Sequence, residues 1–247
     1  MHEATHYNIS SHRRWNDFLS NFLAAWPIGF STDLYRMRHW LHHRYLNTEK
    51  DMDWVRKQGV ANWQFPQSHG RFWGFALSHS FGLGILEIIG AIRAVGVFNR
   101  KDLPRALPYY IALAGAITWG GFWTEVALYW VLPYCTTMLF LHRVRNVSEH
   151  FGLPGTNSLN MTRDIVGSPV EEFFFGPHNA NIHLLHHHYP YIPCYRLKAA
   201  RRYFLSNCPE YRDKGYVNRG YFLPTGRSVY RDLTKTRSGA EEKKRAA

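Results

Sequence analysis

The sequence predicts a mostly α-helical protein that is embedded in a membrane and carries clustered histidines. Three observations predict this class. Residues 107–141 form a run of thirty-five residues with one formal charge, Glu125. Histidines recur at the three- and four-residue spacing that places side chains on one helix face. Aromatic residues make up 16% of the chain and charged residues only 19%, which excludes a disordered protein.

The apolar run 107–141 is too long for one membrane helix and long enough for two short ones, since a single span needs about 20 residues. Gly120 and Gly121 lie near its middle, where a helix break is expected. We therefore predict a hairpin of two transmembrane helices, 107–121 and 122–141. The alternative is a pair of buried helices in a soluble protein, but no other part of the chain could cover so apolar a pair.

A second apolar stretch, 72–98, is interrupted by His79, Glu87, Arg93 and five glycines. This composition predicts a helix that lies along the membrane surface, or dips in and returns. The histidine clusters must meet at one metal centre, so an even number of membrane crossings must separate box two from His150. The two crossings within 107–141 already satisfy this condition, so residues 72–98 cannot cross the membrane a third time. Residues 18–30 are apolar but too short to cross.

Charge is distributed unevenly along the 247 residues. The formal net charge is +12, and the segment from Pro190 onward contributes fourteen Lys or Arg against five Asp or Glu. Basic segments that flank membrane spans mark the cytoplasmic side. No nucleic-acid recognition motif accompanies the charge, so no nucleic-acid partner is expected. Three cysteines without a CxxC spacing exclude a disulfide scaffold and a cysteine-rich zinc module.

Nine of the fifteen histidines form patterns typical of metal ligands. Two HxxHH patterns and one HxxxH pattern place two or three imidazoles on one helix face. Imidazole suits iron, zinc, copper or nickel, and excludes an oxygen-only site for calcium or magnesium. The isolated His12, His69 and His79 are expected to lie outside the site. The candidates are His2 and His6 (box one), His39, His42 and His43 (box two), His183, His186 and His187 (box three), and His150.

Box one, HEATH, also satisfies the HExxH pattern of zinc proteases, with Glu3 as a general base. That alternative leaves both HxxHH boxes without a role. Nine imidazoles are too many for one tetrahedral ion and indicate two ions. The nearby carboxylates Glu3, Asp51, Asp53 and Glu149 are expected to be helix-end or loop charges.

The three boxes resemble those of the membrane fatty acid desaturase family, in which HxxxH, HxxHH and HxxHH are separated by membrane helices. The resemblance rests on residues 35–53, on 176–197 with its trailing prolines, and on RVRNVSEH at 143–150. It covers residues 1–205 and is nearest to the bacterial branch that includes rhizobitoxine-type desaturases. Residues 206–247 are predicted to form a basic cytoplasmic tail.

The resemblance implies that the nine histidines bind two irons as a non-haem di-iron centre, with Asn146 near the centre through a water. It implies O2 as co-substrate, an external electron carrier such as ferredoxin or a reductase, and a lipid or fatty acyl substrate that gains a double bond. It also implies an integral membrane protein of the bacterial inner membrane, with the active site on the cytoplasmic side. A hydroxylase or ketolase of an alkyl or carotenoid substrate uses the same boxes.

The start of the chain departs from the family pattern, in which two membrane helices precede box one. Here box one begins at residue 2, so a desaturase-like fold without its first helix pair is expected. His2 is then expected on an unanchored terminus. A fragment of a longer protein and a shortened, non-catalytic metal-binding remnant are both compatible with this feature.

Overall fold

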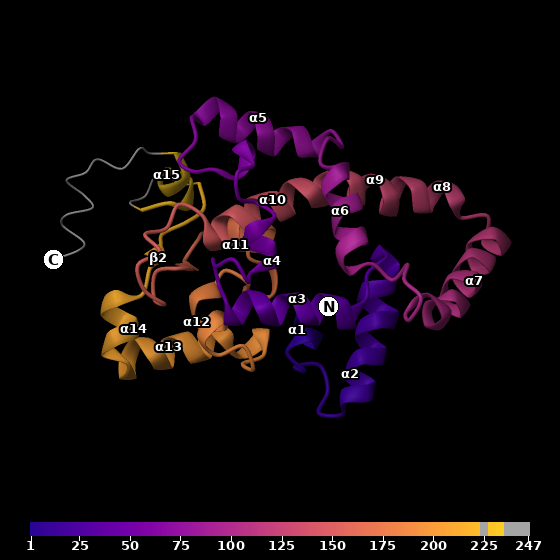
Figure 1. Ribbon diagram of the computed structural model, residues 1–247, viewed down its shortest axis with the longest axis horizontal. Helices are drawn as coiled ribbons and strands as arrows, with labels where there is room; N and C mark the ends of the chain where they lie inside the picture. The colour runs from indigo at the N-terminus through magenta and orange to yellow at the C-terminus, as the bar shows by residue number, and fades with distance from the viewer. Residues whose placement is uncertain (223–226, 235–247) are drawn as a thin grey trace.

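The computed structural model describes residues 1–222 and 227–234. In this part of the chain almost all regular structure is helical, as predicted, and one pair of short strands is present. The helices are α1 His2–Thr5, α2 Arg13–Ser20, α3 Thr32–Arg44, α4 Met52–Val55, α5 His69–Ser80, α6 Ile85–Val95, α7 Leu103–Gly120, α8 Trp123–Val126, α9 Leu132–Cys135, α10 Thr137–His150, α11 Pro169–Phe175, α12 His183–His188, α13 Leu197–Asn207, α14 Pro209–Lys214 and α15 Val229–Thr234. Figure 1 shows a compact lobe that contains the N-terminus, and an arm formed by α7, α8 and α9 that extends from it.

The two strands, β1 Asp164–Ile165 and β2 Val217–Asn218, join distant parts of the lobe. They pair in parallel, with Asp164 opposite Val217. Short helical turns complete the structure. They are a π-helical turn at Asn21–Ala25, a second at Ala127–Val131, and 3₁₀ turns at Trp26–Ile28, Ala61–Trp63, Pro177–Asn179 and Cys194–Arg196.

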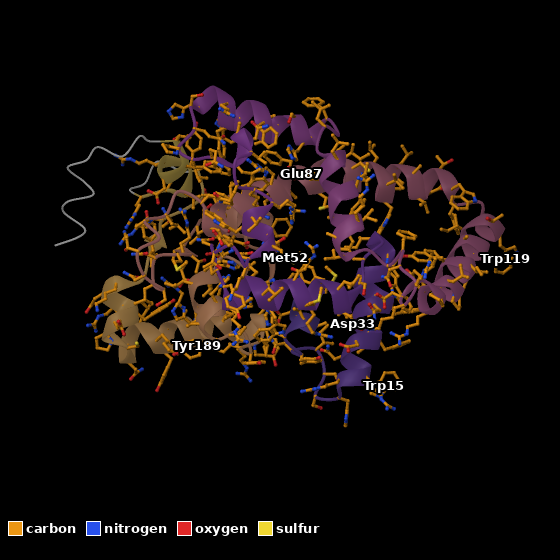
Figure 2. All side chains as sticks on the ribbon, in the orientation of Figure 1. Trp15, Asp33, Met52, Glu87, Trp119 and Tyr189 are labelled. Carbon is orange, nitrogen blue, oxygen red and sulfur yellow. The ribbon has the colours of Figure 1, made fainter. Side chains whose placement is uncertain are left out.

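The arm is a helical hairpin that turns at the predicted glycines. Helix α7 ends at Gly120, and Gly121 adopts φ 71°, a left-handed conformation that glycine accepts without strain. From Trp123 the chain continues as a nearly unbroken helix to His150, which is long and apolar enough to cross a membrane. The apolar side chains of its first part, from Trp123 to Leu132, are largely uncovered, whereas Leu139, Val144 and Val147 near its end are buried in the lobe. Trp119 at the tip of the arm is 93% exposed (Figure 2). Within the described residues, this is one candidate span where the sequence predicted two.

The second apolar stretch forms two helices rather than one. Helices α5 and α6 meet at an angle of 71°, and together they are apolar enough for a broken span or a re-entrant loop. Gly82 at the bend has φ 79°. Gly84 is also required, because a Cβ there would lie 2.4 Å from the ring of His79. The bend between α5 and α6 is compatible with the re-entrant form of the segment that the sequence predicted for residues 72–98.

The predicted topology can be tested by accessibility. In a cysteine-free background, Val60→Cys and Lys101→Cys flank the bent pair, and Trp119→Cys marks the arm tip. We expect an impermeant maleimide applied from the cytoplasmic side to label the first two positions and to leave the third unlabelled. Labelling of Val60→Cys and Lys101→Cys from opposite sides would contradict a shared metal centre.

Two apolar clusters form the core of the lobe. The first packs α5 and α10 against the C-terminal segment through Phe72, Val147, Tyr221 and Leu233. The second surrounds α12 through its buried Leu184 and Leu185, with residues of α13 and α14. Residues 209–222 and 227–234 of the predicted tail thus pack into the lobe, and residues 235–247 lie outside the described residues. The predicted division of the chain into a domain at 1–205 and a basic cytoplasmic tail at 206–247 stays a prediction.

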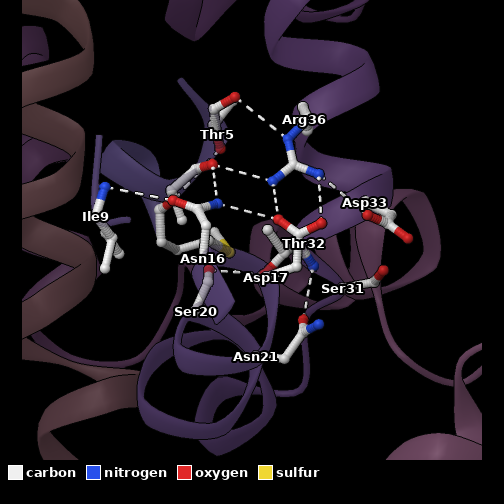
Figure 3. A network of polar contacts seen from close by, with 12 residues as sticks. Thr5, Ile9, Asn16, Asp17, Ser20, Asn21, Ser31, Thr32, Asp33 and Arg36 are labelled. Carbon is white, nitrogen blue, oxygen red and sulfur yellow. Dashed lines mark hydrogen bonds and ion pairs between the residues drawn. The ribbon is translucent and has the colours of Figure 1, made fainter. Parts of the chain in front are cut away.

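Box one is held firmly in the structure, contrary to the expectation of an unanchored terminus. Ala4, Thr5 and His6 are buried. The Arg36 guanidinium, from α3, donates to the carbonyl oxygens of Thr5 and Ala4 at 3.2 and 3.0 Å. Asn16 of α2 also donates to the Ala4 carbonyl, at 2.8 Å, so α1 is fastened to two neighbouring helices (Figure 3).

Candidate metal centre

Box two is presented by α3, whose N-terminus is fixed by its own sequence. The Ser31 hydroxyl accepts a hydrogen bond from the Leu34 amide, a typical N-cap. Because a helix turns about 100° per residue, His39 and His43 point to one side, and His42 points to another. One short helix therefore supplies imidazoles to two neighbouring positions.

Box three is presented by α12, whose first turn is held by a residue from β1. The Asp164 carboxylate accepts from the amides of Leu184 and Leu185 at 3.0 and 3.4 Å. Its other oxygen accepts from Arg201 Nε at 3.0 Å and from the Tyr211 hydroxyl. Asp164 is fully buried, so this network fixes α12 against the core.

All nine candidate histidines come together in the lobe, in two adjacent groups. The two groups meet where the rings of His43 and His187 stack with centroids 4.2 Å apart. The first group contains His2, His6, His39, His43 and His186, with ligand atoms within 4.8 Å of one another. The second contains His42, His150 and His187, and His183 joins it through Nε2 contacts of 3.0 Å to His150 and 3.1 Å to His187.

The spacing of the ring nitrogens fits metal coordination. Nε2 atoms of His6 and His39, of His39 and His43, and of His42 and His150 lie 3.0, 3.0 and 3.2 Å apart. Nitrogens bound to one ion at about 2.1 Å are about 3.0 Å apart when the bonds are perpendicular and about 3.4 Å apart in a tetrahedron. Two of the three observed distances equal the first value and the third lies between the two values, so the spacing suits an ion with four or more ligands.

Unpaired buried nitrogens point to the same conclusion. His2 Nε2 and His186 Nε2 are buried and have no hydrogen-bond partner among the described residues. An unpaired buried polar atom is costly, and a metal ion is a partner that compensates the cost. The donor set contains imidazoles from four separate segments, so it also excludes the zinc-protease interpretation of box one, in which His2 and His6 act with one further ligand.

Burial keeps these imidazoles neutral, the form that binds metal. It lowers the pKa of His6 to about 3 and that of His43 to about 2, and the charges of neighbouring histidines act in the same direction. Burial also lowers the pKa of His39, His186 and His187 well below the usual value. Protons therefore do not compete for these nitrogens at neutral pH.

Three of the four carboxylates expected to be helix-end or loop charges also lie behind histidines, whereas Asp53 faces Arg56 at the surface as expected. Asp51 Oδ2 is 2.9 Å from His42 Nδ1, Glu3 is 3.5 Å from His2 Nδ1, and Glu149 is 3.7 Å from His183 Nδ1. Burial alone would raise the pKa of Asp51, but the hydrogen bond with His42 brings it below its usual value. An ionised Asp51 accepts the Nδ1 proton of His42 and leaves Nε2 free to bind metal.

Asn146 lies on the same face of α10 as His150, one turn away. Its side-chain oxygen accepts a 2.8 Å hydrogen bond from Lys57 Nζ. Sequence reasoning missed Lys57, which is buried, and burial lowers its pKa to about 8. No spacing pattern links residues 57 and 146, so only the fold could reveal this pair.

The isolated histidines lie outside both groups, as expected. His12 is exposed, His69 contacts the Tyr230 hydroxyl at 2.6 Å, and His79 lies 3.5 Å from Glu87 at the α5–α6 bend. Two further histidines, His142 near His150 and His178 just before box three, also lie outside the two groups.

Replacing Asp51 with Asn is expected to weaken metal binding by about 10–100-fold, the usual effect of losing a carboxylate behind a histidine ligand. Asn can still cap α4, which Asp51 does now, so the helix is retained. Titration of the metal-free protein with Co²⁺, followed by absorbance, measures the affinity. The matched control is Asp53→Asn, which removes a surface carboxylate that faces Arg56. An equal loss in both variants would contradict the role of Asp51.

Comparison with known proteins agrees with the site. The family model described as fatty acid desaturase matches residues 1–216. The chain belongs to the fatty acid desaturase family. A curated relative, dihydrorhizobitoxine desaturase of Bradyrhizobium elkanii, is 27% identical over 219 residues, with 81% of this chain and 61% of the relative covered. The chain thus spans less than two-thirds of that relative's length. No solved structure matches the chain. The family predicted from the histidine boxes is confirmed.

Proposed function

We propose that the protein is an oxygen-dependent, di-iron desaturase that introduces a double bond into a fatty acyl or lipid chain. The observation that carries this proposal is the convergence of nine imidazoles into two adjacent groups with metal-like spacing. Family membership supports an oxidoreductase of the desaturase type. The apolar arm supports a membrane location, for which we propose the bacterial inner membrane with the lobe on the cytoplasmic side.

The chain's own residues would hold and tune the centre. His2, His6, His39, His43 and His186 would bind one iron, and His42, His150, His183 and His187 the other. Iron, when bound, supplies the chemistry that activates O2 and removes hydrogen from an unactivated C–H bond. Asp51 fixes the tautomer of His42, and we expect Asn146 to contact the centre through a water, with its oxygen oriented by Lys57.

Tyr35 illustrates how the site limits added charge. Its ring stacks on His39 with centroids 5.4 Å apart. Burial raises the pKa of Tyr35 to about 12, so the phenol stays neutral at physiological pH. A histidine-only site with neutral neighbours holds a redox metal without bringing further negative charge to it, while the carboxylates act from behind the rings.

Product analysis tests the proposal. The full chain, iron-loaded in lipid nanodiscs, receives O2 and electrons from ferredoxin and its reductase. Acyl lipids and dihydrorhizobitoxine are offered as separate substrates, the second because the relative is named for it. We expect mass spectrometry to show the loss of two hydrogens from an acyl chain. A main product with one added oxygen would replace the desaturase with a hydroxylase, and no product from an iron-loaded chain would favour the non-catalytic remnant.

A further inference from the structure

A continuous aromatic contact leads from the protein surface to the histidines. The ring of Tyr191, which is 67% exposed, lies 5.6 Å from that of Trp40 between centroids. The Trp40 ring in turn lies 5.2 Å from His6 and 6.0 Å from His43. Both histidines belong to the five-histidine group. Two side chains thus connect solvent with the candidate ligands, although neither is itself a candidate ligand.

The surface around Tyr191 is aromatic and basic. We define the Tyr191 surface as Tyr191 with the exposed residues Arg44, Tyr189, Tyr195 and Arg196. Arg44 follows Trp40 by one turn of α3, and the Arg196 guanidinium lies over the Tyr195 ring at 5.7 Å. No Asp or Glu occurs in the sequence between Glu172 and Glu210. The segment that follows box three therefore has basic but no acidic side chains of its own. Glu3 and Glu172 contact it from other parts of the chain, through the Cys194 amide and Lys198.

The position of this surface suits a partner in water. Tyr189 lies at the edge of the lobe, at the opposite end of the molecule from Trp119 at the tip of the apolar arm (Figure 2). A partner on the Tyr191 surface would therefore not compete with the membrane for space. Exposed tyrosines and arginines are also the residue types that supply most binding energy at protein interfaces.

We propose that the Tyr191 surface docks an acidic one-electron carrier protein and that its electrons enter the metal centre through Tyr191 and Trp40. The proposal rests on the proposed desaturase function, which consumes electrons. For each double bond, one alkyl chain and O2 react with two electrons and two protons, giving one alkene and two waters. Two reduced carrier molecules supply the electrons and leave oxidised. Basic side chains on the surface would steer the acidic carrier and set its orientation.

Trp40 is suited to this task by its contacts. It is the one tryptophan of α3, and it lies between His39 and His43 in the sequence of the helix. Its ring contacts ligand candidates from both box one and box two, so an electron that reaches it needs one further step to the five-histidine group.

Docking is tested first, on the metal-free full chain in nanodiscs. The probe is a plant-type ferredoxin, an acidic [2Fe–2S] protein, and surface plasmon resonance measures its Kd. Reversal of the surface charges in Arg44→Glu with Arg196→Glu is expected to weaken binding by about tenfold or more at low salt. The matched control, Arg212→Glu with Lys214→Glu on α14, makes the same charge change elsewhere and is expected to bind like the wild type. Equal weakening in both double variants, or in neither, would overturn the surface.

Electron entry is tested by stopped-flow absorbance of reduced ferredoxin mixed with the iron-loaded protein. We expect Trp40→Leu and Tyr191→Ser to slow ferredoxin oxidation by an order of magnitude, and Trp40→Phe to restore most of the rate. Tyr203→Ser removes a tyrosine of similar exposure, 65% against 67% for Tyr191, and should leave the rate unchanged. Reduction of the same variants by dithionite should remain normal, since a small reductant does not need the docking surface.

The outcomes separate this inference from the proposed function. An unchanged rate in Trp40→Leu would overturn the path. Slow reduction of that variant by dithionite as well would also overturn it, because Trp40 would then act by packing the ligands. Failure of the proposed function has a different signature: wild-type protein would oxidise ferredoxin normally and form no desaturated product.

Discussion

Replacing His186 with alanine is expected to lower the bound iron from about two to about one per chain and to abolish turnover. His186 belongs to the five-histidine group, and its Nε2 is buried without a hydrogen-bond partner in the described part of the chain. Its removal leaves a group of four that lacks the contribution of box three. Elemental analysis of detergent-purified protein measures the iron, and lipid mass spectrometry measures turnover.

The control for this variant is on the same helix. His188→Ala removes an imidazole from α12 that is exposed and whose Nδ1 is 2.9 Å from the Leu184 carbonyl oxygen. It is expected to keep both irons and full activity. Equal losses in the two variants would mean that α12 had merely unfolded. A wild-type protein with one zinc and no iron would contradict the two-iron site altogether.

Replacing Arg36 with methionine is expected to release box one from the lobe. The Arg36 side chain is only 11% exposed, and it pairs with Asp17 and Asp33 in addition to the two α1 carbonyls. Methionine replaces the unbranched apolar stem of the side chain but leaves Asp17 and the carbonyl oxygens without this donor. Breaking a buried ion pair by removing one partner usually costs about 3–5 kcal/mol. Because Asp17 is partly exposed, we expect the free energy of opening the segment to fall by about 3 kcal/mol, the lower end of that range.

Amide hydrogen exchange of residues 4–8 measures this opening directly, and iron content measures its consequence for His2 and His6. The control Arg14→Met removes an exposed arginine from α2. We expect faster exchange and lower iron content in Arg36→Met only. Unchanged exchange in Arg36→Met would show that Asn16 and the buried contacts of Ala4 are sufficient to hold box one.

The sequence by itself determined which histidines could act together within each box. Helical spacing predicted two neighbouring imidazoles in box one and three in each of boxes two and three, which are eight of the nine histidines that the fold assembles. The ninth, His150, belongs to none of these three patterns. The helix break at Gly121 was also predictable, because glycine tolerates the left-handed conformation that such a turn requires. The family followed from the boxes alone.

Only the tertiary structure decided how the histidines divide between the two groups. His186 joins His39 and His43, whereas His187 joins His42 and His150, because the orientation of α12 relative to α3 and α10 is set by buried contacts far from the boxes. Asp164 holds α12 from β1, Arg36 holds α1 from α3, and Lys57 reaches Asn146 across 89 residues. Local spacing fixes the direction of a side chain on its own helix, but the position of one helix against another depends on long-range packing and on the pairing of buried polar groups.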